Sequence, residues 1–143
     1  MGKAVKVVFH TNVWVSFFLN KTLSKDLSKI LTQEVTVYVS RDILAETSKV
    51  LTYPKITQIL KNTDFAPRDI LRAIAQNTCL VEPKTKITVI TTDPEDNKIL
   101  ECSREADADF IVTGDNHLLK LQEFNRTKIL SPRDFINHYF AQK

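Results

Sequence analysis

Several acidic side chains of this 143-residue sequence directly follow apolar runs that predict buried strands. Asp93 and Asp96 come after residues 88–90, and Asp115 comes after residues 110–113. Ligands of open α/β sheets bind outside the carboxyl ends of the strands, so these acids are expected at one edge of the sheet. Carboxylates that converge there repel one another unless a divalent cation neutralises them.

Glu46 is a further acid with an unusual position, because it lies along the flank of a predicted apolar helix stripe, between Ile43 and Val50. Oxygen-rich clusters of this kind suit Mg²⁺ or Mn²⁺, and phosphoryl chemistry is a frequent use of them. The sequence contains neither a Gly-rich phosphate loop nor a closely spaced cysteine pair that would point to another chemistry. These acids therefore favour metal-dependent hydrolysis of a phosphodiester.

Each acid also has a simpler structural interpretation. Asp93 and Asp115 can cap the helices that follow them, because free N–H groups and the helix dipole favour an acid there. Capping is the preferred interpretation for Asp93, and for Asp115 taken alone. Glu46 can be a surface acid paired with Lys49, three residues further along the helix.

Asp96 fits the simpler interpretation least well. Ile99, Leu100 and Ser103 lie three, four and seven residues after it, so its side chain shares the helix face that packs on the sheet. A carboxylate at the edge of a packed face needs a partner, and a bound cation is the simplest one.

His10 ends the first apolar run of the chain, and Thr11 and Asn12 follow it. Its imidazole could be a metal ligand, a catalytic base near neutral pH, or the first polar side chain after a strand. A lone histidine after a strand is more often structural, and the sequence supplies no partner that would orient it as a base. All three interpretations stay open at this point.

The elements that must position these residues alternate between strand and helix. Strands are expected at residues 5–9, 35–39, 110–113 and 128–130, and residues 79–81 and 88–90 are short strand candidates. Helices are expected at residues 13–19, 23–31, 43–51, 56–61, 68–76, 94–106 and 118–121, and from Pro132 onward. This order predicts an α/β domain with a mainly parallel sheet of four or five strands and helices on both faces. A turn is expected at Gly114, the only glycine apart from Gly2, because glycine accepts positive φ.

Composition narrows the class of protein without identifying it. The length and the 43% apolar content fit one domain over residues 1–143. The sequence has no signal-peptide core and no membrane-spanning apolar run, so a cytoplasmic protein is expected. A net charge of +3 is compatible with an anionic partner but too small to indicate nucleic acid. Cys79 and Cys102 are widely spaced and are expected to be buried free thiols.

Four segments resemble the PIN-domain ribonuclease family, particularly its single-domain members found as toxins of toxin–antitoxin pairs. They are VVFHTNVWVS, SRDILAE, DPEDNKILECSREADADFIVTGD and ILSPRDF, and they occur in the family order over nearly the whole chain. The resemblance implies a three-layer α/β/α sandwich, cleavage of RNA with Mg²⁺ or Mn²⁺, frequent homodimerisation and an antitoxin partner.

The resemblance also implies roles for individual residues. Glu46, Asp96 and Asp115 match the acidic positions of the family's metal site, and Asp93 is a further candidate ligand. The polar positions beside that site match Thr11, Asn12 and Thr113.

Two positions depart from the family pattern. His117 stands where many members have a further acid, and His10 stands where the pattern has an aspartate before Thr-Asn. A histidine there removes a negative charge and offers nitrogen, which favours Mn²⁺, Zn²⁺, Co²⁺ or Ni²⁺ over Mg²⁺. The protein could work with a softer metal, retain weak Mg²⁺ activity through its three acids, or bind RNA or protein without cutting.

Two alternatives come from other functional classes. A catalytically impaired PIN-like domain that binds RNA or protein gains support from His10. A phosphoacceptor signalling domain also places acids at strand ends, but it carries an acidic pair after the first strand and a lysine after the last. The matching places here hold His10-Thr11 and Ser131-Pro132, which argues against that class.

Overall fold

The computed structural model describes residues 4–31, 35–90 and 93–141. Residues 1–3, 32–34, 91–92 and 142–143, which the prediction of one domain over residues 1–143 includes, lie outside the described part of the chain. Within the described residues, every helix is too short or too polar to cross a lipid bilayer.

The described elements alternate much as the sequence predicts. The strands are β1 (Val5–Phe9), β2 (Val35–Ser40), β3 (Cys79–Val81), β4 (Phe110–Val112), β5 (Glu123–Phe124) and β6 (Thr127–Leu130). The helices are α1 (Thr11–Leu19), α2 (Lys21–Leu31), α3 (Arg41–Val50), α4 (Pro54–Leu60), α5 (Pro67–Gln76), the 3₁₀ turn η1 (Pro94–Asp96), α6 (Asn97–Ala106), α7 (Asn116–Leu119) and α8 (Pro132–Ala141). Three helices begin with proline at the first position, where its missing N–H costs nothing.

The sheet has the strand order β3-β2-β1-β4-β6-β5, and all neighbours are parallel except β5 and β6. This confirms the predicted α/β class, with six strands rather than four or five. Because β1 and β4 are parallel neighbours in the middle of the sheet, their carboxyl ends bring His10 and Thr113 side by side.

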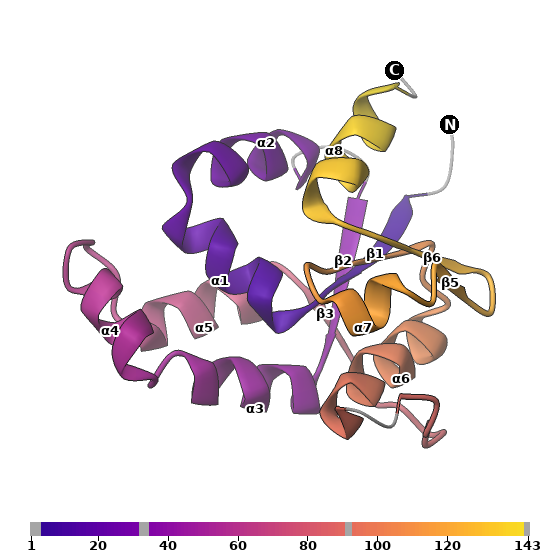
Figure 1. The fold of residues 1–143 in the computed structure, drawn as a ribbon. Coiled ribbons are helices and arrows are strands. Elements are labelled where there is room, and N and C mark those ends of the chain that lie inside the picture. The colour runs from indigo at the N-terminus through magenta and orange to yellow at the C-terminus, as the bar shows by residue number, and fades with distance from the viewer. Residues whose placement is uncertain (1–3, 32–34, 91–92, 142–143) are drawn as a thin grey trace.

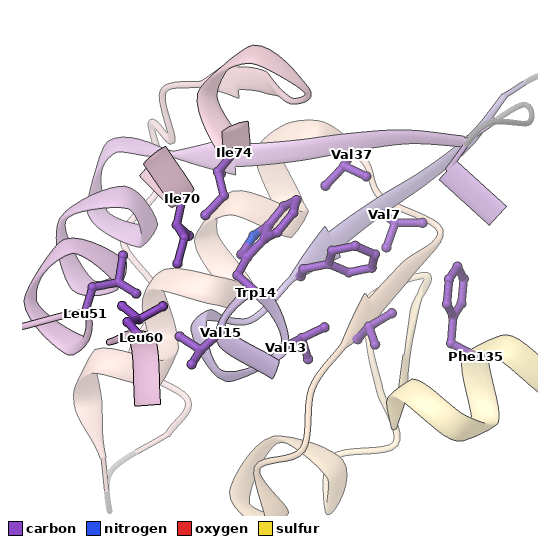
Figure 2. Packing of buried hydrophobic residues seen from close by; sticks show 12 residues of the cluster. Val7, Val13, Trp14, Val15, Val37, Leu51, Leu60, Ile70, Ile74 and Phe135 are labelled. Carbon is purple, nitrogen blue, oxygen red and sulfur yellow. The ribbon is translucent and has the colours of Figure 1, made fainter. Parts of the chain in front are cut away.

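Side chains alternate along β1 and fill a core on each face of the sheet. Val7 and Phe9 pack against α1, α5 and α8, whereas Val8 packs against α6 and α7. Figure 1 shows α1, α2 and α5 on one side of the strands and α6 on the other. Figure 2 shows the first of these cores, with Trp14 at its centre. These two cores fix the central strands and therefore the sheet edge where the acids were predicted.

The predicted strand at residues 88–90 is wrong, because no strand is assigned to this described segment. Side chains of α6 form hydrogen bonds with backbone groups of this segment instead. Asn97 accepts a hydrogen bond from the Ile90 N–H and donates one to the Ile90 carbonyl, both at 2.8 Å. Glu101 accepts from the Ile87 N–H at 2.9 Å. The polar groups that a neighbouring strand would have paired are thus satisfied by a helix.

A turn was expected at Gly114 because glycine accepts a positive φ, but Gly114 does not have a positive φ. The described residues with positive φ are Asp107, Gln122 and Asn125, and short polar side chains tolerate this conformation best. Asn125 lies in the two-residue loop that joins β5 to β6. This small hairpin was not predicted from the sequence, because its loop contains no glycine.

The prediction for the cysteines is correct for one of the two. Both thiols are free, but only Cys102 is buried and Cys79 is exposed on the edge strand β3. Burial raises the pKa of the Cys102 thiol to about 12, against a smaller lowering by a hydrogen bond with Ser40. Cys102 is therefore an inert core residue.

Candidate metal centre

His10 lies at the junction of β1 and α1, where it is the N-cap residue of the helix. Its backbone N–H donates to the Val112 carbonyl of β4 at 3.0 Å, which extends the parallel pairing past the end of β1. The side chain is buried, with 7% of its surface exposed. His10 is thus fixed at the centre of the carboxyl edge of the sheet.

The two ring nitrogens of His10 have different surroundings. Nδ1 lies 2.8 Å from the hydroxyl of Thr113, which is fully buried. Nε2 lies 3.5 Å from Asp96 Oδ1 and 3.8 Å from Glu46 Oε1. When Nδ1 carries the proton and donates to Thr113, the lone pair of Nε2 faces the acids, as in histidines that ligate metals.

Asp96 is the most buried of the predicted acids, with 3% of its surface exposed. It ends η1 and directly precedes α6, yet its carboxylate caps neither element. Its Oδ2 atom is buried and has no hydrogen-bond partner. The predicted burial of Asp96 beside Ile99, Leu100 and Ser103 is confirmed.

Asp115 fits both interpretations that the sequence allowed, as a helix cap and as a candidate metal ligand. Its Oδ1 accepts the backbone N–H of His117 at 2.7 Å, so it caps α7. Its own N–H donates to the Thr113 hydroxyl at 3.0 Å. His10, Asp96 and Asp115 each offer a ligand atom, and these atoms lie within 4.8 Å of one another.

Glu46 and Asp93 lie outside this group of three. The Glu46 side chain is 30% exposed and contacts the group through the Nε2 atom of His10. Together with His10 and Asn12 it lines an open cavity of about 290 Å³. Asp93 is exposed and occupies the N-cap position of η1, as the preferred interpretation expects, but its side chain makes no capping hydrogen bond there.

The polar residues predicted beside the site hold its backbone in place. The Oδ1 atom of Asn12 accepts a weak hydrogen bond from the Gly114 N–H at 3.5 Å. Thr11 is buried and its hydroxyl lies 3.3 Å from that of Thr47. Because Thr47 donates to the Ile43 carbonyl, Thr11 must donate to Thr47, which ties α1 to α3.

Sequence reasoning overlooked Thr47, Asn97 and Glu101 as residues that position the site. Thr47 lies within the apolar stripe of α3, and a polar residue in such a stripe signals a buried hydrogen bond. Asn97 and Glu101 are four residues apart, so they share a face of α6, but nothing in the sequence showed which backbone they would bind.

Comparison with known proteins gives one family. A family profile described as the PIN domain matches residues 6–117, which include His10, Glu46, Asp96 and Asp115. No curated protein matches the chain.

Proposed function

Because this chain belongs to the PIN-domain family, whose members are typically nucleases, we propose that it is a metal-dependent endoribonuclease that hydrolyses RNA phosphodiester bonds. One observation carries the proposal: His10, Asp96 and Asp115 bring three ligand atoms together at the carboxyl edge of the sheet. Ligands of open α/β sheets bind at that edge.

The residues of this group fit a divalent cation. The unpartnered, buried Oδ2 atom of Asp96 is costly without a cation, because a buried carboxylate oxygen needs compensation. Two carboxylates and one neutral imidazole carry two negative charges, which a divalent ion balances. His10, Asp96 and Asp115 are the proposed ligands, and a rotation of the partly exposed Glu46 side chain or of the exposed Asp93 side chain would add an oxygen.

A divalent ion in this position supplies an acidified attacking water and positive charge next to the scissile phosphate. The chain's own residues do the positioning. Thr113 orients the His10 ring, and the cap bond from His117 fixes the Asp115 carboxylate. Glu46 lies at the wall of the open cavity, where its carboxylate can orient the RNA or accept a proton.

The donor set also sets the metal preference. One imidazole nitrogen among carboxylate oxygens favours Mn²⁺ over Mg²⁺, because Mg²⁺ prefers oxygen alone. We propose further that the protein acts as the toxin of a toxin–antitoxin pair, as a homodimer with an antitoxin protein as partner. This part of the proposal rests on the resemblance of the four sequence segments.

A second function is supported by two contacts of the His10 side chain. If His10 is protonated, its imidazolium pairs with Asp96 and Glu46 at 3.5 and 3.8 Å and replaces a metal as the compensating charge. The domain would then be a catalytically impaired module that binds RNA or protein.

RNA cleavage by the purified protein in Mg²⁺, Mn²⁺ and EDTA decides between the two functions. We expect cleavage that is strongest in Mn²⁺, absent in EDTA, and reduced at least about 100-fold by Asp96→Asn or Asp115→Asn. Glu46→Gln tests the outlying acid, and His10→Asp restores the oxygen ligand of the family pattern. If neither the wild type nor His10→Asp cuts RNA in either metal while both stay folded, the nuclease proposal fails.

A further inference from the structure

A second cavity, of about 460 Å³, lies at the other end of α1 from the metal centre. It is lined by Phe18 near the end of α1, by Lys21 and Lys25 of α2, and by the loop that follows α4. Phe65 of that loop is a large apolar side chain with 45% of its surface exposed. An exposed aromatic ring beside two lysines combines an apolar face with positive charge.

The Phe65 ring is held in a fixed position. It packs edge-to-face on Phe18, with ring centroids 5.9 Å apart, and Phe18 packs on Phe17 in the same way at 5.1 Å. Phe17 in turn contacts Trp14 of the core. The loop itself is fixed by Thr63, whose hydroxyl donates to the Leu60 carbonyl and accepts the Phe65 N–H. A ring that is anchored on one side and exposed on the other is a platform for a planar ligand.

The charges around this platform favour an anion. Lys21 and Lys25 are both exposed, and neither forms an ion pair with a described residue. Lys21 is the first residue of α2, where the positive end of the helix dipole adds to the attraction, and Lys25 follows one turn later. Asp64 also lines the cavity, so two positive charges face one negative charge. Asn62 offers both a donor and an acceptor beside the ring.

The two cavities are separate, but both are lined by residues of α1 and by α4 or the loop that follows it. Ile56, in the first turn of α4, lines the cavity that contains His10 and Glu46, and the loop after α4 lines the second cavity. Phe18 follows His10 by eight residues, which corresponds to about 12 Å along a helix. Three or four stacked nucleotides at about 3.4 Å each span this length.

We propose that the cavity formed by Phe18, Phe65, Lys21 and Lys25 binds single-stranded RNA a few nucleotides from the scissile bond. A base stacks on Phe65, and the flanking phosphates contact the two lysines. Stacking on an aromatic platform requires an unpaired base, so this cavity fits single-stranded rather than duplex RNA. This inference rests on the proposed ribonuclease function and adds to it an RNA-binding site outside the metal centre.

Fluorescence anisotropy with a labelled single-stranded oligoribonucleotide in EDTA tests the binding site without cleavage. We expect Phe65→Ala to weaken binding about 5- to 100-fold and Phe65→Trp to retain it. Leu80→Ala, at an exposed apolar residue of β3, is the matched control and should leave binding unchanged. An RNA of the same length without bases should bind wild type and Phe65→Ala equally.

The lysines are tested by the salt dependence of the same binding. Lys21→Gln with Lys25→Gln should reduce the slope of log affinity against log salt by about 1.4, which is about 0.7 for each phosphate contact on a single strand. Lys84→Gln with Lys86→Gln makes the same charge change on an exposed segment and should leave the slope closer to that of the wild type.

The outcomes separate the two proposals. Binding in EDTA that depends on Phe65, without cleavage in any metal, supports the RNA site and overturns the nuclease. Cleavage in Mn²⁺ with RNA affinity unchanged by Phe65→Ala overturns the RNA site and leaves the nuclease. Sedimentation that shows Phe65→Ala turning a dimer into a monomer, with RNA affinity unchanged, identifies this face as a protein interface and also overturns the RNA site.

Discussion

At the scale of single residues, the hydrogen-bond partners of each side chain determine the geometry of the site. Thr113 contacts one nitrogen of His10 and the N–H of Asp115, so one hydroxyl orients two of the three grouped residues. Asp96 has one oxygen near His10 and one with no partner. The sequence could identify His10, Thr113 and Asp115 from their places after strands, and Asp96 from the packed face of its helix. It could not show that Glu46 contacts the group through His10.

Among the proposed metal ligands, His10 is expected to have the most direct effect on metal choice. We predict that His10→Asp raises the affinity for Mg²⁺ about tenfold or more, because an oxygen and a negative charge replace a nitrogen ligand. Isothermal titration calorimetry with Mg²⁺ and Mn²⁺ measures the change as a ratio of the two affinities. Gln76→Glu adds the same charge at an exposed position at the end of α5 and should leave the ratio unchanged. An unchanged ratio in His10→Asp would mean that this position does not ligate the metal.

At the scale of elements, the sequence predicted most helices and strands within a few residues of their bounds. Periodicity and proline positions were sufficient for α5 and α8, whose first residues are prolines, whereas α4 begins at Pro54, two residues before its predicted start. The segment at residues 88–90 was misjudged because its apolar residues suit a strand equally well. Ile87 and Ile90 are indeed buried, but against α6 rather than beside another strand. A periodic apolar pattern predicts which residues are buried, but it does not predict which groups form hydrogen bonds with their backbone.

The contacts of Asn97 with Ile90 therefore hold the irregular segment that ends at Ile90. We predict that Asn97→Ala lowers the free energy of unfolding by about 1 to 3 kcal/mol, since both polar backbone groups of Ile90 lose their buried partner. Hydrogen exchange measured by mass spectrometry should show faster exchange at residues 84–90. Arg104→Ala, an exposed position on the same helix, is the control. Unchanged exchange in this segment would show that Asn97 does not hold it.

At the scale of the whole molecule, the two edges of the sheet carry different sets of polar residues. The carboxyl edge gathers His10, Asp96 and Asp115, whereas the amino edge is tied together by Asp109 and Arg126. The apolar pattern and the order of elements predicted the sheet and hence the edge at which His10, Asp96 and Asp115 lie. The amino-edge contacts were not foreseen, because charged residues outside regular elements give no periodic signal.

Asp109 links three parts of the amino edge. Its Oδ2 accepts the Lys6 N–H of β1 at 2.9 Å, and its Oδ1 pairs with Arg126 of the β5–β6 loop at 2.6 Å. Partial burial raises the pKa of this carboxyl, but the hydrogen bonds from Lys6 and Arg126 outweigh burial and lower the net pKa below its ordinary value of 3.8. The folded state therefore favours the charged form of Asp109.

A carboxyl with a lowered pKa stabilises the fold above its unfolded pKa, and that contribution is lost as the pH falls through the lowered folded value. We predict that Asp109→Asn costs about 1 kcal/mol at neutral pH, a modest amount because the pair is partly exposed. The difference from wild type should shrink as the pH falls below 3.8. Urea unfolding at a series of pH values measures it, with Glu123→Gln, an exposed acid of β5, as control. A difference between wild type and Asp109→Asn that stays constant down to acid pH would contradict a role for the charged carboxylate in holding this edge.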